Sequence, residues 1–203
     1  MRLFVAFDLS GEVRRSLSEL IARLRPLVPA AQAHWVRPDA MHLTLKFIGE
    51  LKSSGAGAVA PIRDALARVR SPHAVDLHFR ALGFFPHERS PRVLWCGVEA
   101  SPNLAPLAAH VEDALSSLNF PREDRAFVPH LTLARFSSPT GLAALVDHAG
   151  DLQSHDFASA RESSFHLFQS FLKPSGAEYT KLASFDFVAA PLKLDSHRPK
   201  GSA

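Results

Sequence analysis

The chain of 203 residues is 46% hydrophobic and carries a formal net charge of +3. This length and composition suffice for a buried core, in one domain or two small lobes, and they exclude collagen-like and low-complexity chains. The mild charge does not indicate a dedicated duplex-DNA-binding protein, but it suits an enzyme whose small pocket accepts a phosphate.

The sequence has the features of a soluble cytoplasmic protein. No apolar segment reaches the roughly 18 residues that a membrane-spanning helix needs, so we expect no membrane partner. The single cysteine, Cys96, excludes an internal disulfide and is expected to be a small buried residue rather than a nucleophile. We expect residues 1–192 to form a single bilobal domain and the polar segment 193–203 to be a C-terminal tail.

The two halves of the chain have the same order of predicted elements. Apolar periodicity and turn residues predict, in the first half, a strand at 3–9, a helix capped by Ser10, a strand at 42–48, a turn at 53–57, a helix around 59–69 and a strand at 75–84. The second half is predicted to contain a strand at 92–100, a helix at 104–118, a strand at 130–136, a helix at 141–149 and strands at 163–172 and 178–188. No obvious linker separates the halves, which indicates duplication within one compact unit.

The tetrapeptide His-Leu-Thr-Leu occurs twice, at His42 and at His130, 88 positions apart. Threonine is scarce in this chain, and random order would place a threonine two positions after a histidine only about 0.2 times. On a strand, residues i and i+2 point to the same face. His42 and Thr44 should therefore project together, as should His130 and Thr132, and a pseudo-twofold arrangement would bring both pairs to one cleft.

Two histidines on opposite sides of a phosphodiester suit general acid–base catalysis, in which one takes a proton and the other gives one. Threonine hydroxyls can stabilise the non-bridging oxygens as charge builds. By strand alternation Lys46 is expected on the same face as His42, and Arg135 lies where its planar group could reach a phosphate. These residue types do not by themselves decide which histidine is the acid.

Two alternatives compete with the catalytic interpretation. A lone His-x-Thr on a strand is usually structural, but two copies in matching halves favour a functional role. A metal site would need a third ligand, and the sequence has no His-x-His, HExxH or cysteine pair, so we expect no metal.

At these residues the sequence resembles the two-histidine (2H) phosphoesterases, and among them the bacterial and archaeal RNA 2′,3′-cyclic phosphodiesterases, formerly called 2′-5′ RNA ligases. Similar segments extend over nearly the whole chain. They are "RLFVAFDLS", "HLTLKFIGEL", "GFFPHERSPRVLWCGV", "FVPHLTLARF" and "FHLFQSFLKPSGAEYTKLASF".

The resemblance implies an α+β fold in which two pseudo-twofold-related antiparallel sheets flank a central cleft, with helices on the outside. It also implies hydrolysis of an RNA terminal 2′,3′-cyclic phosphate to a 2′-phosphomonoester, without metal or cofactor. By resemblance, His42 is the proton donor and His130 the proton acceptor, and Thr44, Thr132 and Arg135 contact the phosphate. The expected partners are RNA ends or nucleotides that carry a cyclic phosphate, and we expect a monomer.

Three more residues are candidates for lining the cleft: Lys46, Phe85 and Tyr179. Phe84 and Phe85 could stack on a base, although packing in the core is the simpler role. Two other functions remain open at this stage. One is ATP-independent, reversible 2′-5′ RNA ligation by the same residues. The other is a non-catalytic module that binds RNA ends, which would be expected to lack one histidine or Arg135.

Overall fold

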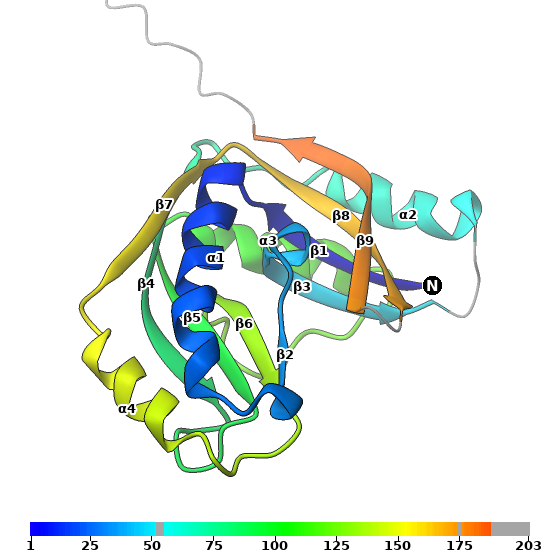
Figure 1. Cartoon of the computed structure of the whole chain (residues 1–203). Coiled ribbons are helices and arrows are strands. Elements are labelled where there is room, and N and C mark those ends of the chain that lie inside the picture. The colour runs from blue at the N-terminus through cyan, green and yellow to red at the C-terminus, as the bar shows by residue number, and fades with distance from the viewer. Residues whose placement is uncertain (52–54, 174–175, 188–203) are drawn as a thin grey trace, which may run out of the picture.

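The computed structural model describes residues 1–51, 55–173 and 176–187, and it contains two antiparallel sheets (Figure 1). Within these residues the four-stranded sheet has the order β3-β1-β8-β9 and the five-stranded sheet the order β2-β6-β5-β4-β7. The strands are β1 (Arg2–Asp8), β2 (Ala33–Trp35), β3 (His42–Glu50), β4 (Val75–Phe85), β5 (Val93–Ala100), β6 (His130–Phe136), β7 (Asp156–Glu162), β8 (Ser164–Lys173) and β9 (Gly176–Asp186).

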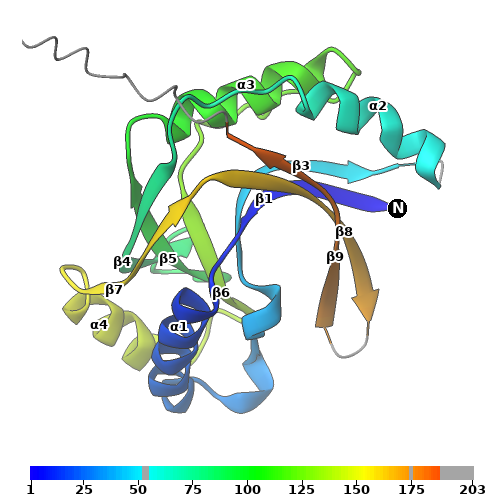
Figure 2. The same ribbon diagram turned by 90° about the horizontal axis from the view of Figure 1, so that it is seen from above.

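The helices lie outside the two sheets (Figure 2). They are α1 (Gly11–Leu24), α2 (Ala56–Leu66), α3 (Leu104–Ser116) and α4 (Ala143–Asp151), with short 3-10 turns at Arg25–Leu27, Ala30–Gln32 and Pro38–Ala40. Helices α2 and α3 pack on each other, and α3 contacts β3 of the four-stranded sheet. Helices α1 and α4 contact β7 and β4 of the five-stranded sheet. One continuous apolar core joins both sheets and these helices.

The order of strands along the chain differs from their order in the sheets. Strand β4, which closes the first half of the chain, pairs with β5 in the five-stranded sheet. Strand β8, which comes from the second half, pairs with β1 in the four-stranded sheet. Each half thus contributes a strand to the sheet that holds the other half's motif, so neither sheet is built from one half alone.

Most predicted elements are present, with shifted ends. Helix α1 begins after Ser10, whose hydroxyl accepts a hydrogen bond from the Val13 amide at 3.3 Å. Its buried stripe is the predicted one: Val13, Leu17, Leu20, Ile21 and Leu24. Strand β3 does not end at Gly49 but continues to Glu50. Gly49 has a φ of 91°, and the register with β1 shifts between it and Phe47. The short β2 and the half-exposed β7 were not predicted, since neither has a clear apolar alternation.

Some predictions concern residues outside the described part of the chain. These are residues 53–54 of the turn predicted at 53–57, the end of the last strand at Val188, and the tail at 193–203. The last two residues of that predicted turn, Ala56 and Gly57, instead begin α2. No helix in the described ranges is both long enough and apolar enough to cross a membrane.

Candidate active site

The two His-x-Thr motifs lie on strands at facing edges of the two sheets. Strand β3 is the edge strand of the four-stranded sheet. The start of β6, residues 130–132, extends beyond β2, which pairs with residues 134–136, and beyond Val36, whose amide donates a hydrogen bond to the Leu133 carbonyl at 2.9 Å. Strands β3 and β6 contact each other where the two sheets meet (Figure 2). The fold therefore brings the two copies of the motif together, as the duplication predicted.

Each motif strand contains a β-bulge directly after its threonine. In β3, Thr44 pairs with Ala6 and Lys46 with Val5, so Leu45 has no partner on β1. In β6 the bulge falls at the equivalent place: Thr132 pairs with Trp95, Ala134 pairs with Leu94, and Leu133 is the extra residue.

The extra residue reverses the alternation of side chains along the strand. The burial pattern from histidine onward is the same in both strands: half-buried, buried, half-buried, buried, buried, exposed. We call the sheet face that carries the histidine and threonine the motif face. Beyond the bulge, the residue that returns to this face is Phe47 in β3 and Arg135 in β6.

The bulge overturns one prediction. Lys46 does not share the motif face with His42, because it is the second of two consecutive residues that point into the protein. Its side chain is only 3% exposed. The Lys46 Nζ lies 2.7 Å from a carboxylate oxygen of Glu112 on α3 and donates a hydrogen bond to the Pro121 carbonyl at 2.8 Å. Lys46 therefore does not line the site.

Both histidine rings are held by the same backbone contact. Nδ1 of His42 lies 2.9 Å from the Ala40 carbonyl oxygen, and Nδ1 of His130 lies 2.8 Å from the Val128 carbonyl oxygen. A carbonyl only accepts, so Nδ1 donates its proton in each case. Nε2 is then the nitrogen that remains for proton transfer, and it is unprotonated in the neutral ring.

Aromatic side chains flank both histidines, and they include two of the candidates from sequence. Tyr179 lies edge-on to His42, with ring centroids 5.0 Å apart, and Phe85 lies edge-on to His130 at 4.9 Å. Phe84, by contrast, is 6% exposed and belongs to the core.

Sequence reasoning missed two further aromatic neighbours. The ring centroid of Phe4 lies 4.6 Å from that of His42, and the ring centroid of Trp95 lies 6.4 Å from that of His130. The Trp95 ring lies against Gly83, where a Cβ atom would come within 2.2 Å of the ring. The pairing of β1 with β3 and of β5 with β6 decides which faces these residues occupy. Strand alternation could have placed Phe4 and Trp95 beside the histidines only if the neighbouring strands had already been known.

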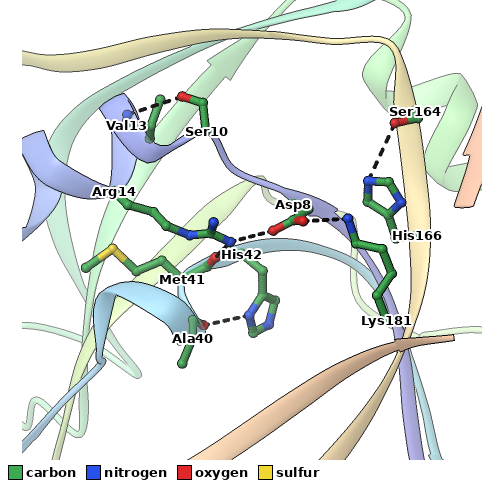
Figure 3. A network of polar contacts seen from close by, with 10 residues as sticks. All are labelled: Asp8, Ser10, Val13, Arg14, Ala40, Met41, His42, Ser164, His166 and Lys181. Carbon is green, nitrogen blue, oxygen red and sulfur yellow. Dashed lines mark hydrogen bonds and ion pairs between the residues drawn. The ribbon is translucent and has the colours of Figure 1, made fainter. Parts of the chain in front are cut away.

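A cluster of charges beside His42 was also missed (Figure 3). Asp8, the last residue of β1, pairs with His42 in register. Its carboxylate accepts hydrogen bonds from Arg14 of α1 and from Lys181 of β9, whose Nζ lies 2.6 Å away. A hollow of about 180 Å³ opens here. Its lining residues are Phe4, Asp8, Arg14, Asp39, Met41, His42, Phe168, Tyr179 and Lys181.

The surroundings of His42 favour its neutral form. Burial lowers the pKa of His42 to about 4, and the positive charges of Arg14 and Arg135 act in the same direction. The hydrogen bond to Ala40 and the charge of Asp8 oppose this shift without cancelling it. Because the field of Arg135 reaches His42, the two motifs contribute to one electrostatic environment.

The ionisation of Asp8 and Tyr179 follows from the same neighbours. Burial alone would raise the pKa of Asp8, but the contacts with Lys181 and Arg14 outweigh it and lower that pKa. Burial raises the pKa of the Tyr179 hydroxyl, although the nearby Arg135 and Arg37 oppose the shift. At neutral pH the site thus presents a carboxylate clamped between two cations, and a neutral phenol.

Within the described ranges, no group of three or more histidine, cysteine, aspartate or glutamate side chains could hold a metal ion. The predicted absence of a metal stays a prediction. Cys96 is buried, and burial raises the pKa of its thiol to about 12, so it has no nucleophilic character at neutral pH.

The family model of the 2′-5′ RNA ligase superfamily matches residues 13–167, a range that contains both motif strands. The chain belongs to this superfamily. It is 32% identical over 186 residues to an RNA 2′,3′-cyclic phosphodiesterase of Methanothermobacter thermautotrophicus, a match that covers 91% of this chain and 98% of the relative. It is also 35% identical over 192 residues to one of Thermus thermophilus, which covers 91% and 89%.

Solved structures of the superfamily have the same fold. TT0787 of Thermus thermophilus aligns over 93% of this chain and 99% of its own, with a TM-score of 0.72 and 29% identity. LigT of E. coli in complex with 3′-AMP aligns over 92% and 97%, with a TM-score of 0.71 and 25% identity. The predicted α+β fold with two antiparallel sheets is therefore confirmed, as is the resemblance to the 2H phosphoesterases. The relatives of Archaeoglobus fulgidus and Thermotoga maritima, 33% and 32% identical, are also named RNA 2′,3′-cyclic phosphodiesterase, and these names support the predicted class of enzyme.

Proposed function

We propose that this chain converts the terminal 2′,3′-cyclic phosphate of RNA to a 2′-phosphomonoester, with His42 as proton donor and His130 as proton acceptor. The supporting observation is the pair of identically anchored histidines, each with Nδ1 bound to the carbonyl two residues before it. Both lie on strands that contact each other, so an acid and a base can act on one phosphate.

The reaction proceeds by displacement at phosphorus. Nε2 of His130 takes a proton from water as the water oxygen forms a bond to phosphorus. The bond between phosphorus and the ribose O3′ breaks, and Nε2 of His42 delivers a proton to that oxygen. The products are a free 3′-hydroxyl group and a phosphate attached to O2′. His130 ends protonated and His42 neutral, and exchange with water restores the starting forms.

Thr44, Thr132 and Arg135 contact the non-bridging oxygens in this proposal. The two threonines share the motif face with the histidines, and the bulge in β6 returns Arg135 to that face. A guanidinium group is suited to this task because it stays charged and donates two parallel hydrogen bonds to a phosphate. Charge that develops on the phosphoryl oxygens is then stabilised by donors already in place.

The donor role of His42 depends on the substrate. With a pKa of about 4, His42 is neutral in the free protein at pH 7. A phosphodiester anion bound between His42 and Arg135 offsets the positive charges that lower this pKa, and it favours the imidazolium form. The substrate thereby raises the pKa of its own proton donor. Tyr179 and Phe85 hold the two rings by edge contacts.

The partners in this proposal are RNA ends or nucleotides that carry a 2′,3′-cyclic phosphate. The enzyme uses no metal and no cofactor, and it acts as a monomer in the cytoplasm.

The test is incubation of the protein with an RNA oligonucleotide that ends in a 2′,3′-cyclic phosphate, with and without EDTA. We expect the oligonucleotide to gain the mass of one water at the same rate in both samples, and phosphorus NMR should place the phosphate on O2′. If the protein bound the oligonucleotide without hydrolysing its cyclic phosphate, the result would contradict the proposal and favour a non-catalytic module that binds RNA ends. Joining to an added 5′-hydroxyl oligonucleotide in preference to hydrolysis would favour ligation. Loss of activity in EDTA, with recovery on addition of one divalent ion, would contradict the metal-free mechanism.

A further inference from the structure

Phe47 is a large apolar side chain that the core does not use. It is 58% exposed, and it is absent from the apolar core that joins the two sheets. The bulge at Leu45 returns it to the motif face, on the same strand as His42 and Thr44. A phenylalanine held open to solvent on the face that carries the catalytic motif calls for a functional explanation.

Phe47 is the open end of a row of aromatic rings that crosses the four-stranded sheet. In the strand register Phe4 pairs with Phe47 on one side and with Phe168 on the other. The Phe4 ring lies 6.3 Å from the Phe47 ring and stacks on the Phe168 ring at 5.2 Å, with 14° between their planes. Lys181 lies at the other end of the row, with Nζ 6.0 Å from the centre of the Phe168 ring.

This aromatic row is continuous with the site. Phe4, at its middle, lies 4.6 Å from the His42 ring. Phe4 and Phe168 are 3% and 7% exposed, so their faces are already covered, whereas most of the Phe47 side chain is free. Phe47 therefore offers an exposed surface for stacking, and Phe4 lies between it and His42 in the row.

The second motif strand shows what this position can do. Phe47 and Arg135 occupy equivalent places, each the first exposed residue after the bulge and each on the motif face. Arg135 presents a charge that suits a phosphate, while Phe47 presents a flat apolar ring. A strand of RNA carries both chemistries, since phosphates alternate with bases whose flat faces stack on aromatic side chains.

We propose that Phe47 is a stacking platform for a nucleobase of the RNA substrate, the base of the nucleotide next to the one that carries the cyclic phosphate. The inference rests on the proposed function and extends it to the length of RNA that the enzyme recognises. The ligand is a single strand, because a base can stack on a side chain only when it is not paired within a duplex. Arg135 and Arg14, whose charges act on His42, and Lys181 at the far end of the aromatic row suit the negative charge of such a strand.

The test compares Phe47→Ala with a matched control, Phe171→Ala. Phe171 of β8 is also exposed, at 43%, but it lies three positions after Phe168 in an unbroken stretch of strand pairing and so faces the other side of the sheet. The probe is a fluorescein-labelled single-stranded RNA with a 2′-phosphate at its end, and the measurement is its dissociation constant by fluorescence anisotropy at one fixed salt concentration.

We expect Phe47→Ala to weaken binding by about 5- to 150-fold, the usual loss for one stacked base. Phe171→Ala should bind as the wild type does, and Phe47→Trp should retain the affinity. In turnover of a cyclic-phosphate oligonucleotide, Phe47→Ala should raise KM and leave kcat unchanged. With a nucleoside 2′,3′-cyclic phosphate, which has no neighbouring base, Phe47→Ala should match the wild type.

Equal affinity of Phe47→Ala and Phe171→Ala for the RNA would overturn the proposal. So would a changed oligomeric state of Phe47→Ala in sedimentation with unchanged RNA affinity, which would make this face an interface between copies of the chain. A wild-type protein that hydrolyses no cyclic phosphate would instead contradict the proposed function. The binding measurement would still decide the role of Phe47.

Discussion

Strands β3 and β6 have the same backbone plan but different neighbours. Both carry His-x-Thr, both have a bulge after the threonine, and both anchor the histidine Nδ1 on the carbonyl two residues earlier. Beneath the bulge, however, β3 has the buried Lys46 where β6 has Ala134.

The surroundings of the two histidines differ as well. His42 lies next to the charged cluster of Asp8, Arg14 and Lys181, whereas His130 lies against the uncharged rings of Phe85 and Trp95. The repeated backbone places two chemically equal groups in different surroundings, and those of His42 favour its neutral form in the free protein.

The largest expected effect comes from removing either histidine. His42→Ala and His130→Ala should each lower kcat by about 10²- to 10⁴-fold, the usual contribution of a positioned proton-transfer group. The double variant should lose much less than the product of the two, because both groups act in one transition state. The measurement is single-turnover hydrolysis of a cyclic-phosphate oligonucleotide.

A substrate with an activated leaving group sharpens this comparison. Such a leaving group barely needs a proton, so it should restore most of the activity of His42→Ala and little of that of His130→Ala. Restoration of His130→Ala instead would mean that the roles are reversed. Full activity in both single variants would contradict the proposed mechanism.

The next largest effect is on stability and concerns Lys46, the buried residue that follows the bulge in β3. Lys46→Met should reduce the free energy of unfolding by about 3–5 kcal/mol, because it leaves the Glu112 carboxylate without its buried partner. The double variant Lys46→Met/Glu112→Leu should regain most of this loss. Urea unfolding measures both.

Lys173→Met is the control for this prediction. Its ion pair with Glu178 is exposed, at 52% and 40% for the two side chains, and such pairs contribute about 0–1 kcal/mol. If Lys46→Met were no more destabilising than Lys173→Met, the buried pair would not fix β3 against α3.

The smallest effect is a shift in titration. In the free protein His42 should titrate near pH 4, well below its ordinary value of 6.5, in NMR spectra that follow the ring protons with pH. The unfolded chain takes up this proton at a higher pH than the folded chain does. The free energy of unfolding should therefore fall as the pH drops from 6.5 to 4.

Inorganic phosphate offers a simple way to test the influence of a bound anion. Its addition should raise the pKa of His42, since an anion next to Arg135 offsets the charge that lowers it. A pKa of 6.5 or above for His42 in the free protein would show that burial and the neighbouring positive charges do not favour its neutral form.

The sequence alone predicted much of this protein, because the signals involved are local. Apolar alternation and spacing predicted the β6 strand and the buried stripe of α1, and the repeated tetrapeptide identified the two strands that now lie in contact. The chain itself carries these periodicities, and they do not depend on which distant segment becomes the neighbour.

Only the tertiary structure decided which side chains join the two motifs. The bulges exist because β1 and β5 each have one residue fewer than their partner over the same stretch, and local alternation cannot reveal a mismatch with a distant strand. For this reason Lys46 was placed on the wrong face and Phe47 was not noticed. Asp8, Arg14 and Lys181 meet through pairing and packing between separate elements, and the low pKa of His42 follows from the burial and charges that this packing creates.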